Sequence, residues 1–328
     1  MKICFLENTN FCYNSNDLHS PLLRGSETTL INLSLELNKM GHKITVINNC
    51  PRNEVINSIR WLNFNNYNEN ETFEIAISNN DIRFFNKINA KKKVLISHSL
   101  QNFEKFIRKK QLLSYIKHKP IVATLGKYHL KNRNKLLRLF GNINLDIGIK
   151  DDFLSANINI KKENQAIFTS SSYRNLDLLI NLWKDKIYFR LPKTNLLVTP
   201  TNKFDLSHNI KLRKKGTTNE LINDLLRSMV YLIPGHKSEL CCQAVEEAKE
   251  LCIPTATLGI GSLSEQIENE KSGLISKNIN HFSDNIVQLF NDEKLYNKIR
   301  NHLIHNRGKK RWSIISKNFI NDVIRFKS

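Results

Sequence analysis

Two glutamates, Glu239 and Glu247, have a spacing that could serve chemistry. They lie eight residues apart in PGHKSELCCQAVEEAKELCIPTATLGIGSLSEQIENEKSGLI (234–275), which opens with an apolar run typical of a strand. Eight residues are about two helical turns, so a helix here would carry both carboxylates on one face. Its start offers free N–H groups to an anion, and its carboxylates can accept hydrogen bonds from ribose or sugar hydroxyls. The alternative is a solvated helix with scattered glutamates, and we expect the neighbouring Glu246 to be exposed.

An arginine and a histidine extend this chemistry to other loops. Arg174 lies in FTSSSYRNLDLLINLW (168–183), directly before an expected helix, where a guanidinium can clamp a diphosphate through two hydrogen bonds. His98 ends the apolar run KVLISH, and a neutral imidazole can donate to a sugar hydroxyl or accept from one. Each has a plainer alternative: a surface arginine near a helix cap, and a strand-end histidine satisfied by a neighbour.

A loop near the N-terminus could bring backbone close to a ligand. In LLRGSETTLINLSLELNKMGHKITVI (22–47), the residues Gly25, Ser26 and Glu27 precede an expected helix over 27–41. A glycine lets backbone approach a ligand, and Ser26 can cap the helix. The helix ends at a C-cap glycine, Gly41, and its apolar face consists of Leu30, Leu33, Leu37 and Met40.

The elements that must position these residues alternate along the chain. Segments with a 3.6-residue period separate short runs rich in Ile and Val, which predict parallel strands buried on both faces. One of the helices opens with a capping box, Thr217 to Glu220. The expected strands are 2–8, 42–49, 73–79, 93–98, 120–125 and 144–150 and, after a polar break at 161–165, 166–171, 196–200, 210–214, 230–235 and 254–259.

This alternation is a βαβ pattern and predicts α/β folding with doubly wound sheets. The length of 328 residues favours two domains. We expect an N-terminal domain over 1–155, a C-terminal domain over 165–305, and a C-terminal helix within 306–328 that is free to pack back on the N-terminal domain. Ligands of such sheets bind outside the carboxyl ends of the strands, so the loops there should carry the chemistry.

The segment 234–275 resembles the C-terminal signature of the family-4 (group-1) retaining glycosyltransferases of the GT-B fold. That signature is Glu-x7-Glu-Ala, Gly-Pro-Val, a Gly-Gly turn followed by Glu, and Gly-Leu. The chain departs from it at Ile253, where the family has Gly, and at Ser262, where it has the second turn Gly. The resemblance covers nearly the whole chain and is strongest over 166–275. The matching residues are Glu239, Glu247, Pro254, Gly261, Glu265, Gly273 and Leu274.

The resemblance implies two Rossmann-like domains facing a central cleft and gives the residues roles. Glu247 would hold the ribose hydroxyls, and Glu239 and His98 would face the donor sugar. Arg174 stands with Asn175 at the family's Arg-Gly position and would hold the diphosphate. The remaining candidates are Lys237 as a second phosphate cation, Gly261, Ser262 and Leu263 as the donor-binding turn, and Gly25, Ser26 and Glu27 as the acceptor-side loop.

The implied reaction is transfer of a hexose from a UDP-, GDP- or ADP-sugar to a saccharide or lipid-linked acceptor with retention, in synthesis of cell-surface polysaccharide or lipopolysaccharide. The resemblance implies no cofactor and no metal, because cations and helix N-termini neutralise the leaving diphosphate. It supplies no secure covalent nucleophile. The first alternative is a non-catalytic GT-B-fold protein that binds nucleotide-sugar or glycan without transfer, and the second is another kind of GT-B enzyme, an epimerase or a phosphorylase.

The net charge of +20 is concentrated in one stretch. Residues 86–150 contain sixteen Lys or Arg but only two acids, Glu104 and Asp146, for a net +14. Two expected amphipathic helices, 102–119 and 127–141, could lie on an anionic membrane surface. Alternatively, their apolar faces cover the sheet while the lysines are solvated, or an A/T-rich genome inflates lysine. We expect no nucleic-acid partner, because stacking aromatics and recognisable modules are lacking.

Several other classes of protein are excluded. No run of eighteen apolar residues predicts a transmembrane helix, and the N-terminal apolar run is too short for a secretory signal. The six cysteines show no paired CxxC spacing, which argues against a disulfide framework or a zinc site. P-loop, GxGxxG, GxSxG and HExxH motifs are lacking. We therefore expect a cytoplasmic protein, peripheral on the inner face of the membrane if the basic stretch binds lipid.

Overall fold

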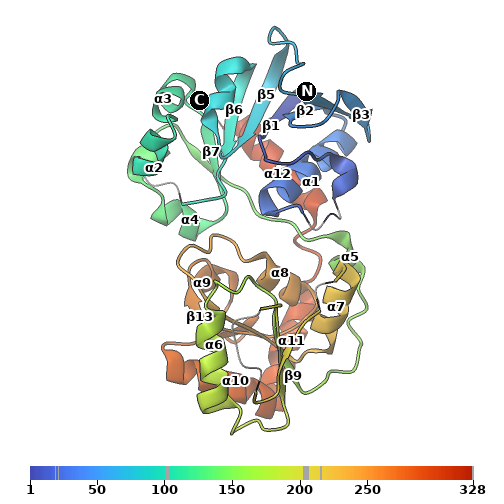
Figure 1. Ribbon diagram of the computed structural model, residues 1–328, viewed down its shortest axis with the longest axis vertical. Helices are drawn as coiled ribbons and strands as arrows, with labels where there is room; N and C mark the ends of the chain where they lie inside the picture. Colours follow the sequence, from blue (N-terminus) through green and yellow to red (C-terminus); the bar gives the residue numbers. More distant parts are fainter. Residues whose placement is uncertain (19, 21, 101–102, 202–206, 215, 327–328) are drawn as a thin grey trace. The chain divides into compact units, whose positions relative to one another are not determined.

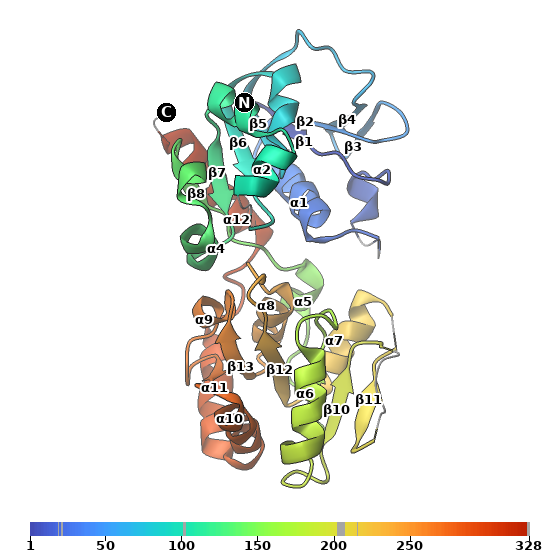
Figure 2. The same ribbon diagram turned by 60° about the vertical axis from the view of Figure 1, so that its left-hand side comes forward.

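The computed structural model describes residues 1–18, 20, 22–100, 103–201, 207–214 and 216–326. The chain forms two compact units (Figure 1, Figure 2): unit 1 is Met1–Gly148 with Trp312–Ser328, and unit 2 is Ile149–Arg311. These bounds differ by several residues from those expected, since 149–155 and 306–311 both belong to unit 2. No helix in the described part of the chain is long and apolar enough to cross a membrane.

Unit 1 contains an eight-stranded sheet in the order β3-β4-β2-β1-β5-β6-β7-β8. All neighbours pair in parallel except the short hairpin of β3 and β4 at one edge, which the sequence analysis did not predict. The strands are β1 (Lys2–Leu6), β2 (Lys43–Asn48), β3 (Glu54–Ile56), β4 (Ile59–Asn63), β5 (Thr72–Asn79), β6 (Asn89–Ile96), β7 (Ile121–Thr124) and β8 (Asn142–Asn144). Their central Ile, Val and Leu side chains are buried, as sheets covered on both faces require.

The expected strand over 144–150 is wrong. The sixth expected strand is instead β8, and Leu145 makes the last hydrogen bond beside it, from its N–H to the Thr124 carbonyl at 2.9 Å. The residues that follow leave the sheet, and Ile149 already pairs within unit 2, with Arg311. Apolar side chains at 145, 147 and 149 are buried without being in a strand, which explains why the pattern looked like one.

The helices of unit 1 are α1 (Gly25–Lys39), α2 (Phe103–Arg108), α3 (Leu112–His118), α4 (Lys127–Asn132) and α12 (Trp312–Arg325). The helix α1 ends at Lys39, and Gly41, whose φ is +85°, follows the C-cap residue Met40, which is 37% exposed rather than part of the buried apolar face. The single helix expected over 102–119 is wrong, since Lys110 adopts a left-handed φ of 54° and separates α2 from α3. Over 127–141 the structure has α4 and a short 3-10 turn, Lys135–Arg138.

The last helix belongs to unit 1, where it packs beside α1 in both views (Figure 1, Figure 2). The Lys92 ammonium closes its C-terminal end by donating to the carbonyls of Val323, Ile324 and Phe326, at 3.0, 2.7 and 2.9 Å. A cation at the last turn also interacts favourably with the helix dipole. Unit 1 is therefore completed by residues that follow unit 2 in the chain.

Unit 2 contains a six-stranded, wholly parallel sheet in the order β11-β10-β9-β12-β13-β14. Its strands are β9 (Gln165–Phe168), β10 (Asn195–Val198), β11 (Ile210–Leu212), β12 (Val230–Gly235), β13 (Thr255–Ile260) and β14 (Gly273–Ile275). Its helices are α5 (Asp151–Ser155), α6 (Leu176–Leu182), α7 (Thr218–Arg227), α8 (Gln243–Glu250), α9 (Leu263–Gln266), α10 (Ile279–Asn291) and α11 (Glu293–His305). The capping box of Thr217 and Glu220 is confirmed at the start of α7.

Candidate functional site

Three loops of unit 2 meet at the carboxyl ends of β9, β12 and β13. Arg174, before α6, lies in the first loop, and Glu239, before α8, lies in the second. The Arg174 Nε is 3.3 Å from the Glu239 Oε2, and the Arg174 Nη1 donates to the Ser238 hydroxyl at 3.3 Å. The side chains of Arg174 and Glu239 are only 15% and 9% exposed. The structure thus brings together two residues that the sequence analysis singled out separately.

The neighbours of Arg174 explain its geometry. Asn175 adopts a left-handed φ of 63° and donates from its side chain to the Gly235 carbonyl at 2.5 Å. Asparagine tolerates this conformation better than most residues, so it can stand where the glycosyltransferase pattern has glycine. On the other side, the Tyr173 ring lies 4.8 Å from the Arg174 guanidinium carbon, a cation–π distance.

Glu239 and Glu247 do not share a helix face, so that prediction is wrong. The helix α8 begins only at Gln243, while Glu239 lies in a turn in which its N–H donates to the His236 carbonyl at 2.9 Å. The eight residues from Glu239 to Glu247 therefore cover a turn, the extended N-cap residue Cys242 and the first part of α8. Both carboxylates nevertheless lie close enough to Cys242 to raise the pKa of its thiol, together with burial.

The turn after β13 is held against the Glu239 loop by backbone contacts. Gly261 has a φ of +75°, and a Cβ there would lie 2.3 Å from the His236 carbonyl oxygen. The Ser262 N–H donates to the Glu239 carbonyl at 3.0 Å. The Ser262 hydroxyl donates to Gln266, and the Leu263 side chain is buried in the core. Both side chains therefore support the turn, and a ligand there would meet its backbone.

Burial sets the electrostatics of the two glutamates. It raises the pKa of Glu239, and the Arg174 guanidinium opposes this. Burial also raises the pKa of Glu247 to about 7, opposed by Lys150. Glu247 is partly exposed to solvent, and among the described residues its carboxylate has no hydrogen-bond or ion-pair partner. Lys237 lies in the same loop as Glu239 and is exposed.

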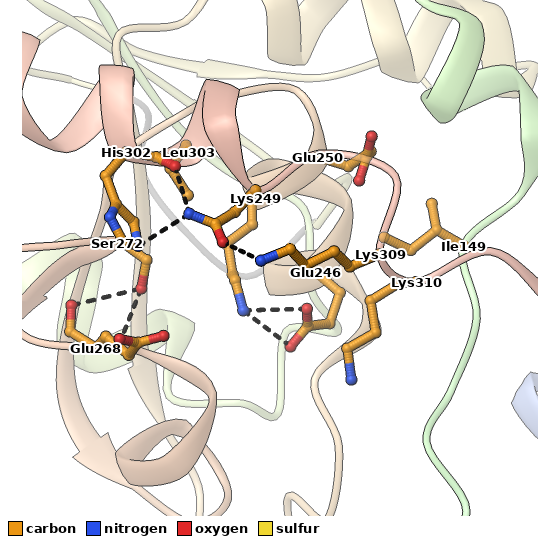
Figure 3. A pocket seen from close by; sticks show the side chains of 11 residues that line it. Ile149, Glu246, Lys249, Glu250, Glu268, Ser272, His302, Leu303, Lys309 and Lys310 are labelled. Carbon is orange, nitrogen blue, oxygen red and sulfur yellow. Dashed lines mark hydrogen bonds and ion pairs between the residues drawn. The ribbon is translucent and has the colours of Figure 1, made fainter. Parts of the chain in front are cut away.

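Glu246 is buried rather than exposed, which corrects the prediction. Its carboxylate pairs with the Lys249 ammonium at 3.1 Å and accepts from the Gln266 amide at 3.0 Å. Figure 3 shows it beside Lys249 in a cavity of about 210 Å³. Glu250 lines the same cavity, and the Gly308 N–H donates a shared hydrogen bond to both of its carboxylate oxygens, each at 3.1 Å. The carboxylates that line this cavity, Glu246, Glu250 and Glu268, are thus all paired within the fold.

In unit 1, Arg24, Ser26 and Glu27 line a polar cavity of about 370 Å³. Ser26 does not cap α1 as expected, because Arg24 occupies the N-cap. The Glu27 carboxylate instead accepts from the Arg24 N–H and from the Ser26 hydroxyl, both at 3.0 Å. Gly25 has open space around its Cα, with nothing within 4 Å of a Cβ placed there. Other lining residues include Glu7, Asn79, Asn80 and Gln111.

Glu7 is a residue that the sequence analysis missed. It directly follows β1, and its carboxylate accepts hydrogen bonds from the Tyr13 hydroxyl and, at 3.0 Å, from the Asn79 side chain. Burial raises its pKa to about 7. An acid at the end of the apolar run KICFLEN was the available signal, since side chains at strand ends line the ligand edge of such sheets.

His98 lies just beyond β6, near this cavity. Its backbone N–H donates to the Asn80 side chain at 2.7 Å, and Asn80 also lines the cavity. Its Nε2 has no partner in the described part of the chain. Burial and the nearby His129 lower the pKa of His98 to about 4, so the imidazole is neutral at pH 7. The described residues contain no cluster of three His, Cys, Asp or Glu that could hold a metal ion.

No protein-family model and no curated protein matches the sequence. Solved structures do match its fold. A glycosyltransferase from Rickettsia africae is 13% identical with a TM-score of 0.68, covering 99% of both chains. Anabaena HepE, in complex with UDP and glucose, is 11% identical with a TM-score of 0.68 over 99% of this chain and 100% of its own. WaaG, a glycosyltransferase involved in lipopolysaccharide biosynthesis, is 12% identical with a TM-score of 0.65 and the same coverage.

The chain has the GT-B fold. The predicted fold class, α/β with two Rossmann-like domains, is confirmed. In GT-B terms, unit 2 is the C-terminal domain and carries the Arg174–Glu239 pair with Glu247. Unit 1 is the N-terminal domain and carries His98 and the loop around Glu27.

Proposed function

We propose that the protein is a retaining glycosyltransferase that moves a hexose from a nucleotide-sugar to a saccharide or lipid-linked acceptor. The observation that carries this proposal is the Arg174–Glu239 pair, which lies with Glu247 where the parallel strands of unit 2 end in a GT-B fold. A diphosphate needs a cation, and a sugar needs carboxylates that accept from its hydroxyls. The HepE structure, which contains UDP and glucose, supports a donor of this class.

Each residue has a part in the proposed reaction. Arg174 binds the donor diphosphate and stabilises the charge that develops as the nucleotide leaves. Glu239, held beside it, accepts from hydroxyls of the transferred sugar, and Glu247 accepts from the ribose. No side chain is assigned as a covalent nucleophile, and the acceptor hydroxyl attacks on the face that the nucleotide leaves, with the leaving phosphate taking its proton. No metal and no cofactor take part.

The proposed acceptor is a precursor of cell-surface polysaccharide or lipopolysaccharide and binds unit 1. The polar cavity beside Glu27 has carboxylates and amides suited to sugar hydroxyls. WaaG acts in lipopolysaccharide biosynthesis, which supports an acceptor of this kind. His98, neutral at pH 7, faces the donor sugar in this proposal and donates to one of its hydroxyls from Nε2, which has no partner in the described part of the chain.

We further propose that the basic stretch binds an anionic membrane from the cytoplasmic side. Three apolar residues of 102–119 are exposed: Ile107 by 49%, Leu113 by 82% and Ile116 by 52%. The core of this region is made by Phe106 and Tyr115. Exposed Lys and Arg surround the apolar side chains, in a pattern typical of surfaces that insert into the interface of anionic bilayers.

Nucleotide-sugar binding tests the donor site. We expect a UDP-, GDP- or ADP-sugar to raise the melting temperature, since a ligand at 100 times its Kd stabilises by about 2.7 kcal/mol. Glu247→Ala should abolish this shift and Arg174→Gln should weaken it, while Glu293→Ala, an exposed glutamate of α11, should change nothing. Stabilisation by no nucleotide-sugar would contradict the proposal, and binding without turnover would favour the non-catalytic alternative.

Liposome flotation tests the membrane surface. The protein should float with vesicles that contain phosphatidylglycerol and not with neutral ones. Leu113→Ser should reduce flotation several-fold, whereas Val55→Ser, 69% exposed on β3 at the other edge of the sheet, should not. Equal binding to both kinds of vesicle, or to neither, would show that the lysines are simply solvated.

A further inference from the structure

Arg133 has a buried guanidinium that no acid in the described part of the chain neutralises. The residue follows α4 and is 2% exposed. None of its three side-chain nitrogens has a hydrogen-bond partner among the described residues. Its backbone, in contrast, is fixed: the N–H donates to the His129 carbonyl at 3.1 Å, and the carbonyl accepts from Arg138 at 2.7 Å.

The groups around Arg133 leave its charge uncompensated. Burial and Arg138 lower its pKa to about 10, opposed by Tyr115, so the guanidinium is charged at pH 7. Both acids of 86–150, Glu104 and Asp146, are exposed to solvent. A buried charge without a counter-ion is costly, because the interior does not replace the hydration that the ion has lost.

Two imidazoles extend the set of unpaired donors. His129 is fully buried, and its Nδ1 accepts from the Leu125 N–H at 3.1 Å. Its Nε2 must then carry the proton, and this N–H makes no hydrogen bond of good geometry in the described chain, although the Ser99 backbone is near enough to raise the pKa of His129. Arg133 acts on the pKa of His129, and His129 on that of His98, so the three side chains are neighbours. His98 is the one of the three that is partly exposed.

We propose that Arg133 and His129 bind a phosphate group carried by the acceptor. The inference rests on the proposed glycosyl transfer and names its acceptor as a phosphate ester. A guanidinium offers a planar set of donors that matches phosphate oxygens, and the His129 Nε2–H adds a further donor. The donor diphosphate is assigned to Arg174 in unit 2, so the group bound in unit 1 is a different one. A bilayer surface is not the source, because exposed lysines meet lipid headgroups while Arg133 is buried.

Binding of inorganic phosphate and of glycerol 3-phosphate, measured by calorimetry and thermal shift at constant ionic strength, tests the inference. We expect both to bind the wild-type protein. Arg133→Gln should weaken both at least 30-fold. The matched control is Arg108→Gln, which removes the same charge from an exposed site of α2 and should leave binding unchanged. Arg174→Gln should also leave this binding unchanged, which separates it from the donor site.

An affinity of Arg133→Gln for phosphate equal to that of the wild-type protein would overturn the inference. Binding of inorganic phosphate but not of glycerol 3-phosphate would overturn the assignment to the acceptor. Loss of vesicle flotation in Arg133→Gln would assign the residue to lipid and overturn it as well. A purely structural arginine predicts that Arg133→Gln unfolds the protein without phosphate, whereas an anion site predicts a melting temperature equal to or above that of the wild type. Should the glutamine variant not fold, Arg133→Lys keeps the charge, loses the planar donors, and should weaken binding several-fold.

The phosphate-binding experiment and the nucleotide-sugar experiment can fail independently of one another. Failure of the proposed function would appear as no nucleotide-sugar binding by the wild-type protein, with phosphate binding at Arg133 intact. Failure of this inference would appear as unchanged phosphate binding in Arg133→Gln, with nucleotide-sugar binding intact.

Discussion

At the carboxyl edge of the unit 2 sheet, the buried charged groups are largely paired within the fold, whereas in unit 1 several are not. Arg174 and Glu239 hold one another, and the turn at Gly261 packs tightly against them. In unit 1, side-chain atoms of Asn79 and Gln111 are buried without partners among the described residues, as are nitrogens of His98, His129 and Arg133. One edge is organised before any ligand arrives, while the other keeps hydrogen-bonding capacity for a ligand to satisfy.

This difference has a physical reason in the loops. In unit 2, the turn after β13 is held against the Glu239 loop by a backbone bond, from the Ser262 N–H to the Glu239 carbonyl. In unit 1, the His98 loop is held by a side chain, that of Asn80, which accepts from the His98 N–H. Backbone contacts persist through most substitutions, but side-chain contacts change with each residue. The unit 1 edge is therefore the part of the molecule where specificity can vary most readily.

The largest expected effect that separates the two edges is that of Gly261→Ala. A Cβ at Gly261 would lie 2.3 Å from a carbonyl oxygen at a φ of +75°, so the variant should lose about 2 to 4 kcal/mol of unfolding free energy. Gly25→Ala, in open space at the start of α1, should stay within about 0.5 kcal/mol of the wild type. Urea denaturation measures both free energies of unfolding. Equal losses in the two variants would show that the loop at Gly261 is no more tightly packed than the loop at Gly25.

An intermediate effect is expected from the pH dependence of Glu7. Its pKa rises from 4.5 to about 7 on folding, so the folded state favours the protonated form. This contribution is fully present below pH 4.5 and is lost as the pH rises through 7, on the order of 3 kcal/mol for a shift of this size. Glu7→Gln should therefore flatten the fall in stability between pH 5 and pH 8.

Glu239→Gln is the control for this prediction. Glu239 is also buried, but the Arg174 guanidinium opposes the rise in its pKa. Its replacement should flatten the profile less than Glu7→Gln does. Denaturation series across this pH range measure both variants. A larger flattening for Glu239→Gln would show that the ionised carboxylate of Glu239 in unit 2 destabilises the fold more than that of Glu7 in unit 1.

The smallest expected effect is that of replacing Asn175, which lies beside the Arg174–Glu239 pair in unit 2. Asn175→Gly should stay within about 1 kcal/mol of the wild type, because glycine readily adopts the left-handed φ of 63° but loses one hydrogen bond. Asn175→Ala should be less stable by about a further 1 kcal/mol, since alanine disfavours that conformation. The reverse order in thermal denaturation would mean that the Gly235 contact, and not the backbone, selects asparagine.

Most strands could be predicted from sequence, because Ile- and Val-rich runs reflect burial on both faces of a parallel sheet. The errors fall where one residue decides the local path. Lys110 ends α2 through a left-handed conformation that lysine seldom adopts, so periodicity alone predicted one helix over 102–119. Likewise, the start of α8 at Gln243 separates Glu239 from the helix, although the spacing of eight fits a helix equally well.

Some residues of the candidate sites could likewise be predicted from the sequence, and others could not. Arg174, Glu239 and Glu247 could be found because they lie in one recurring motif pattern. Arg133 could not, since it looks like any of the basic residues of its stretch until burial distinguishes it. Unpaired buried groups arise from the joint placement of several segments, and no local pattern encodes them.

The division of the chain has a consequence for synthesis on the ribosome. Unit 2 is one continuous segment, and its two ends are joined by the pairing of Ile149 with Arg311 and by the 2.9 Å bond from the Ile149 N–H to the Lys310 carbonyl. All of its strands have emerged before α12 is made. Unit 1, begun first, thus lacks the helix that packs on α1 until the whole of unit 2 has been synthesised. The second domain is expected to mature first, and the order of folding reverses the order of synthesis.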